Sequence, residues 1–146
     1  MDEIDRVSAE VVDAAIRIHR ELGPGLLESV YETVLAVSLE RAGWKVDRQK
    51  PIDITFEGMT IAGAFRADLI VGERLIVEIK SVEQLVPVHG KQLLTYLRLL
   101  RQPVGLLLNF GGETMKEGIR RIVNGYQPAA GRSASPRLRV KSDYGD

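Results

Sequence analysis

The chain has 146 residues, enough for one domain with a buried core, and we expect that domain to cover residues 1–124. It contains no cysteine, no apolar run long enough to cross a bilayer and no signal-peptide pattern. These absences exclude a disulfide-stapled scaffold and a helical membrane protein, and they favour a cytoplasmic location. The formal net charge is zero, so total charge gives no argument for nucleic-acid binding.

The chain begins with two expected helices. The first covers residues 5–22, where apolar residues recur at helical spacing, and Gly23-Pro24-Gly25 ends it. The second covers residues 26–42 and ends at Gly43. Glu28 lies in the first turn of this helix, where the helix dipole favours an acid whether or not it takes part in chemistry. One face of the second helix carries Glu28, Tyr31, Glu32 and Leu35.

Four strands are expected next. Residues 44–49 and 52–56 alternate apolar and polar side chains and are separated by Pro51, which predicts two short strands. Residues 60–71 and 75–80 predict a further pair joined by a tight loop.

A helix and a strand are expected in the later part of the chain. The helix covers residues 88–101, and the apolar run at 104–110 is typical of a buried parallel strand. Residues 115–123 favour an edge strand, and residues 125–146 contain too few apolar side chains to pack, so we expect a flexible basic tail. The predicted order is α-α-β-β-β-β-α-β, an α/β fold class.

The segment from Arg66 to Lys80, R-A-D-L-I-V-G-E-R-L-I-V-E-I-K, places three charges inside apolar strands. A three-residue loop at 72–74 best matches the apolar faces, because it pairs Leu69 with Val77 and Ala67 with Ile79. We therefore expect the same face of the first strand to carry Phe65, Ala67, Leu69 and Val71. The same register places Asp68 opposite Glu78 and Arg66 opposite Lys80.

Two facing carboxylates suit a hard divalent cation. Asp68, Glu78 and the main-chain carbonyl of Ile79 could hold Mg²⁺, with Mn²⁺ as an alternative, and Lys80 would lie beside the ion. Because the two carboxylates repel each other and are partly buried, at least one should have a raised pKa in the absence of metal unless Lys80 and Arg66 compensate. A second interpretation stays open, in which these charges form an ion-paired polar face of a half-exposed sheet.

The helix at 88–101 presents three different faces. Gln92 and Tyr96 share one face, and Lys91 and Arg98 lie on another. The apolar face carries Leu93, Leu94, Leu97 and Leu100. From Lys91 to Lys141 there are ten basic residues and two acidic ones, so Lys91 and Arg98 are candidate contacts to a phosphate backbone. Arg66, on the hairpin beside Asp68, is a third candidate. The alternative is a solvated helix face followed by a basic tail.

Four motifs in this order resemble the PD-(D/E)XK nuclease-like superfamily and, within it, the group named for its GxxExxY motif. Gly25, Glu28 and Tyr31 supply that motif; R-A-D-L supplies an acid, V-E-I-K supplies E-x-K, and Q-L-L-T-Y is similar to the Q-x-x-x-Y motif of RecB-type nucleases. Alanine stands where the superfamily's name has proline. The resemblance implies a restriction-endonuclease-like mixed sheet flanked by helices. It also implies Asp68 and Glu78 as metal ligands, Lys80 as the catalytic lysine, Glu28 as the helical acid, and Gln92, Tyr96 and Tyr31 as supporting residues.

Two functions are compatible with these features. The first is a Mg²⁺-dependent endo- or exodeoxyribonuclease that hydrolyses phosphodiester bonds in DNA. The second is a module on a nuclease-like fold that binds nucleic acid or protein without cutting. Neither interpretation involves a membrane.

Overall fold

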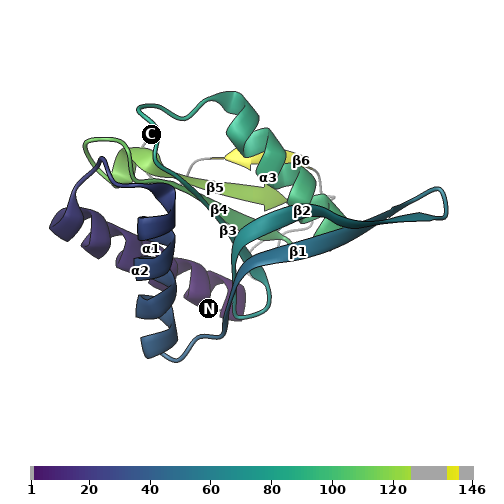
Figure 1. Cartoon of the computed structure of the whole chain (residues 1–146), viewed down its shortest axis with the longest axis horizontal. Helices are drawn as coiled ribbons and strands as arrows, with labels where there is room; N and C mark the ends of the chain where they lie inside the picture. Colours follow the sequence, from purple (N-terminus) through teal and green to yellow (C-terminus); the bar gives the residue numbers. More distant parts are fainter. Residues whose placement is uncertain (1, 126–137, 142–146) are drawn as a thin grey trace.

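A computed structural model describes residues 2–125 and 138–141, which form a mixed sheet with helices on both faces (Figure 1). The elements are α1 (Glu3–Leu22), α2 (Glu28–Arg41), β1 (Val46–Phe56), β2 (Met59–Val71), β3 (Leu75–Lys80), α3 (Pro87–Leu100), β4 (Val104–Asn109), the 3-10 helix η1 (Lys116–Gly118), β5 (Ile119–Asn124) and β6 (Leu138–Lys141). The six described strands lie in the order β1-β2-β3-β4-β5-β6. Among these described strands, only β3 and β4 are parallel neighbours; the other pairs are antiparallel.

Two apolar cores lie on opposite faces of this sheet. On one face, α1 and α2 cover side chains that include Leu69, Val77 and Leu106. On the other face, α3 packs Leu93 and Leu97 against a second set, which includes Ile70, Ile76 and Leu107. All residues of β4 are buried, as expected for a parallel strand covered on both faces.

The helix α1 is held near both of its ends by later parts of the chain. Near its start, the Asp5 carboxylate accepts a hydrogen bond of 3.0 Å from Arg121 of β5. Near its end, the buried His19 ring lies with Nε2 2.9 Å from the Gly112 carbonyl oxygen. Segments that follow β4 therefore help to fix the position of the first helix.

The α/β class and the buried strand after α3 are confirmed, but the strands before α3 differ from expectation in one respect. The segments predicted as two strands around Pro51 form the single strand β1. Proline is tolerated there because β1 lies at the edge of the described sheet, where one side of the strand needs no ladder hydrogen bonds. Three strands, not four, therefore precede α3.

The outer parts of β1 and β2 project beyond the body of the domain as a two-stranded arm, defined here as residues 53–64 (Figure 1). Ile54 pairs with Ile61 and Phe56 with Met59. All arm residues except Ile54 are exposed. The arm therefore has almost no contact with either core.

The prediction for the end of the chain needs correction. Residues 115–123 were expected to form an edge strand, but β5 has a neighbour on each side because β6 pairs with it. Leu138–Lys141 forms this strand within the expected tail, and residues 126–137 and 142–146 lie outside the described part. Among the described helices, none is long and apolar enough to cross a membrane.

Candidate metal-dependent site

The hairpin of β2 and β3 has the register expected from its apolar pattern as far as Leu69, which pairs with Val77. Beyond this point the described pairing stops. There the Asp68 carboxylate replaces a backbone acceptor: its Oδ2 accepts a hydrogen bond of 2.8 Å from the Ile79 N–H. A side chain thus satisfies the backbone group that regular pairing with Ala67 would have used.

Two details of the predicted register are wrong beyond Leu69. Phe65 and Ala67 pack in the core under α3, whereas Leu69 packs on the opposite face, so the alternation along β2 is interrupted at Asp68. Arg66 pairs with Pro51 on the β1 side, and the described pairing of β2 with β3 stops at Leu69, so it does not include Arg66 and Lys80. The cause is local: Asp68 bonds to the backbone of β3, and the neighbouring Gln49 of β1 has a positive φ of 50°.

Glu78 is a buried acid beside a second acid. Its residue exposure is 7%, and its Oε1 atom has no hydrogen-bond partner in the described structure. The pKa of Glu78 is raised to about 9: burial is the largest cause and the neighbouring Asp68 the next, while Lys80 acts in the opposite direction. The expectation that one of the facing carboxyls has a raised pKa is confirmed.

These groups fit a divalent cation. An unpartnered buried carboxylate oxygen is costly unless a cation or a proton satisfies it. Backbone N–H and C=O groups of one strand residue point to the same neighbouring strand, so the Ile79 carbonyl faces the Asp68 side, as its N–H does. Within residues 2–125 and 138–141, no three His, Cys, Asp or Glu side chains lie close enough to hold a metal together. The candidate ligands are therefore two carboxylates and one carbonyl.

A buried acid of α2 connects to this site through Gln49. The Gln49 side-chain amide donates to Glu32 Oε1 at 2.6 Å and to Asp68 Oδ1 at 3.0 Å. Glu32 is 7% exposed and also accepts hydrogen bonds from the Arg48 guanidinium at 3.3 and 3.4 Å. With the Ile79 N–H on its other oxygen, the Asp68 carboxylate is held from both sides.

Neither Glu32 nor Gln49 was among the predicted site residues. Glu32 gave a signal in the sequence, since it shares a helix face with Tyr31 and Leu35 and an acid on a buried face needs a partner. Gln49 gave none, because its role depends on how α2 packs against β1.

Tyr96 of α3 lies close enough to the carboxylates to sense their charge. Its pKa is raised by burial first and then by Glu78 and Asp68. Its ring stacks on Phe65 with centroids 4.0 Å apart. Gln92 lies one turn earlier on the same flank and is exposed.

Lys91 and Arg98 are exposed on the other flank of α3 from Tyr96. The structure therefore does not bring these two cations to the carboxylates. Lys80 is half-buried and follows Glu78 by two positions, so both side chains point to the same face of β3.

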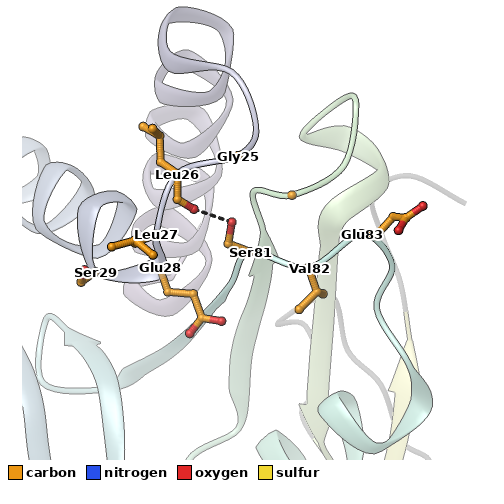
Figure 2. Close-up of a pocket in the computed structure, with 9 residues that line it drawn as sticks. Gly25, Leu26, Leu27, Glu28, Ser29, Ser81, Val82 and Glu83 are labelled. Carbon is orange, nitrogen blue, oxygen red and sulfur yellow. Dashed lines mark hydrogen bonds between the residues drawn. The ribbon is translucent and has the colours of Figure 1, made fainter.

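The GxxExxY segment forms one wall of an open groove of about 730 Å³ next to the end of β3. The opposite wall is the loop that follows Lys80, and Ser81 Oγ donates to the Leu26 carbonyl at 2.7 Å across it (Figure 2). Glu28 lines this groove and is exposed. It borders the end of β3 without forming a three-acid group with Asp68 and Glu78.

Tyr31 is buried beneath the loop that lines the groove and holds this loop in place. Its hydroxyl donates to the Gly23 carbonyl and accepts from the Leu26 N–H at 3.2 Å, and its ring stacks on Phe110 with centroids 4.4 Å apart. It is fully buried. The tyrosine of the motif therefore fixes the loop 23–27 that leads into α2.

Asn109 fixes the opposite wall, and the sequence had not indicated it. Its side chain accepts from the Val82 N–H at 3.0 Å and donates to the Val82 carbonyl at 2.9 Å. The same Oδ1 accepts from the Gly111 N–H at 3.0 Å. A single buried amide at the end of β4 thus holds the loop after β3.

Comparison with known proteins identifies the family of the chain. The family model described as the PD-(D/E)XK nuclease superfamily matches residues 5–122. This range runs from α1 to β5 and leaves out only the first two residues of α1 and the last two of β5. The chain belongs to the PD-(D/E)XK nuclease superfamily. Its mixed sheet with helices on both faces is consistent with a restriction-endonuclease-like fold. No curated protein and no solved structure matched the chain.

Proposed function

We propose that this protein is a metal-dependent nuclease that hydrolyses phosphodiester bonds in DNA. The observation that carries the proposal is the buried Glu78 carboxyl, which has an unpartnered oxygen beside Asp68 and precedes Lys80 by two positions. The assignment to the GxxExxY group within the superfamily is part of the same proposal. It rests on Gly25, Glu28 and Tyr31.

Asp68, Glu78 and the Ile79 carbonyl would hold Mg²⁺ or Mn²⁺. When bound, such an ion lowers the pKa of a coordinated water and neutralises charge on a phosphate. Asp68 is suited to this task because Gln49 and the Ile79 N–H fix both of its oxygens. Ionised carboxylates alone would repel a phosphate, so the ion is required for substrate binding as well.

Lys80 supplies a positive charge on the same strand face as Glu78. It would orient the attacking water or stabilise the negative charge that develops on the phosphate. The Tyr96 hydroxyl lies near both carboxylates, and Gln92 lies one turn away, where it could contact the substrate. Arg66 is exposed two residues before Asp68 and is the proposed contact of β2 with the phosphate backbone.

Glu28 would act at the edge of this site. It lines the groove whose other wall follows directly on Lys80 (Figure 2). The residues that line the groove include two acids, Glu28 and Glu83, and no basic residue, so nucleic acid would enter it only with a bound cation. Glu28 is then the acid that contacts solvent, or a second ion, at the groove wall.

The test is cleavage of a supercoiled plasmid and of labelled oligonucleotides by the pure protein. We expect cutting with Mg²⁺ or Mn²⁺, none with EDTA, and loss of cutting in Glu78→Gln and Lys80→Ala. The matched control is Glu40→Gln, which removes an exposed acid of α2. Metal-independent cutting, or full activity of Glu78→Gln, would refute the proposal. Salt-dependent DNA binding without cleavage under any metal would favour the non-cleaving module instead.

A further inference from the structure

The arm is an amphipathic ribbon with one uncovered apolar face. Ile54 lies opposite Ile61 and Phe56 opposite Met59, so these four side chains share a face. Phe56 is 60% exposed and Met59 58% exposed. The other face carries the pair Thr55 and Thr60, whose hydroxyl oxygens lie 3.4 Å apart.

A ribbon of this kind needs a partner. An isolated two-stranded hairpin is marginally stable in water, and large apolar side chains gathered on one exposed face mark interaction surfaces. The arm nevertheless has a defined shape. The register shifts between Ile52 and Ile54, and the Asp53 carboxylate fixes the irregularity by accepting a hydrogen bond of 2.8 Å from the Gly63 N–H.

The charges of the arm select the kind of partner. Between Lys50 and Arg66 the chain has two charged residues, Asp53 and Glu57, and both are acidic. Phosphate groups would be repelled by such a surface, so nucleic acid is a poor occupant. A protein surface that combines apolar side chains with positive charge would complement the arm.

The outward face of α3 is a surface of this type. Val88, Thr95 and Leu99 are exposed and share one side of the helix, and Val88 is 62% exposed. Lys91 and Arg98 flank this side. The face therefore offers apolar contacts with two adjacent cations, the complement of the arm.

We propose that the arm of one copy of this chain packs against the outward face of α3 of a second copy. A two-fold axis makes this contact twice, so the dimer buries two arms and two helix faces. Doubling matters because a stable interface buries about 800 Å² on each partner, and two arms with two helix faces supply twice the area of one contact. Lys91 and Arg98 then serve contact between copies.

The first test is the oligomeric state of the full chain, measured by sedimentation velocity over a range of protein concentrations. We expect a dimer of the wild type and a dissociation constant raised at least about tenfold in Phe56→Ser/Met59→Ser. The matched control is Thr55→Ser/Thr60→Ser on the other face of the arm, which should leave the dimer intact. Circular dichroism and urea unfolding establish that each variant is folded.

A charge exchange tests the identity of the partner surface. Asp53→Asn/Glu57→Lys changes the arm and keeps an acceptor for the Gly63 N–H, while Lys91→Glu/Arg98→Glu reverses the helix face. Each variant alone should form a weaker dimer, because its arm and its α3 face then carry charges of the same sign, which repel each other. An equimolar mixture should form heterodimers, because each arm then meets an α3 face of opposite charge.

Three results would overturn the proposal. One is a wild-type protein that stays monomeric at all concentrations tested. Another is a dimer that the Phe56→Ser/Met59→Ser change leaves unaltered. The third is a mixture of the two charge variants that fails to associate. Loss of DNA binding in the arm variant of a monomeric protein would assign the arm to nucleic acid instead.

Discussion

The replacement Glu78→Gln should change how stability depends on pH. The folded protein holds a proton on Glu78 up to a pKa of about 9, whereas the ordinary value is 4.5. Between these two values the folded state binds more protons than the unfolded state, so the free energy of unfolding falls as pH rises. Glutamine resembles the protonated carboxyl and does not titrate, so the variant should lack this fall.

The size of the effect follows from the pKa difference. One pH unit within the window corresponds to about 1.4 kcal/mol, so between pH 5.5 and pH 8 the wild type should lose up to about 3 kcal/mol relative to Glu78→Gln. At pH 8 without metal the variant should therefore be the more stable protein. The lower stability of the wild type is expected, because an active site keeps groups that serve function at the expense of stability.

The assay is urea unfolding in EDTA at several pH values, followed by fluorescence of Trp44, the single tryptophan, which is half-buried and donates to Glu10 at 2.9 Å. Glu40→Gln controls for the loss of an exposed acid. A stability difference between wild type and Glu78→Gln that stays constant from pH 5.5 to pH 8 would refute the reasoning. It would mean that the Glu78 carboxyl ionises normally in the folded protein.

Three further outcomes are expected. Mn²⁺ at a hundred times its dissociation constant should stabilise the wild type by about 2.7 kcal/mol and leave Asp68→Asn unchanged in thermal melts, because that variant lacks a ligand; an equal response of both proteins would place the ion elsewhere. Gln49→Ala should reduce metal affinity or cleavage by about 10- to 100-fold with little change in unfolding temperature, whereas Gln49→Glu should not restore it, since a carboxylate cannot donate to Asp68. Tyr31→Phe should lower the free energy of unfolding by about 1–2 kcal/mol in urea titrations, because it removes the hydroxyl that bonds to Gly23 and Leu26; unchanged stability would show that the loop needs no such anchor.

Periodicity in the sequence predicted the features that depend on one element or on two adjacent ones. The three-residue loop and the pairing of Leu69 with Val77 followed from matching two apolar faces. The burial of Leu93 and Leu97, with Tyr96 on a separate flank, followed from the helical repeat. In both cases the residues that had to be matched lie within fifteen positions of each other.

Features that depend on packing between distant elements were not predictable in this way. The interruption of β2 at Asp68 arises because a side chain competes with the backbone for the Ile79 N–H. The link from Glu32 through Gln49 to Asp68 requires α2 to lie beside β1. Pattern reasoning also gave Pro51 too much weight, since an edge strand can contain proline.

The anchoring of α1 by Arg121 and Gly112 has a consequence for synthesis of the chain. Translation produces α1 first, yet its fixed position needs β5, which appears about a hundred residues later. Before β3 and β4 are made, its apolar stripe, with Val11, Ala15 and Ile18, lacks the strands that it packs on, and the contacts of Asp5 and His19 form later still. A ribosome paused before Val104 would therefore hold a nascent chain whose first helix lacks part of its sheet and is exposed to chaperones or to other chains.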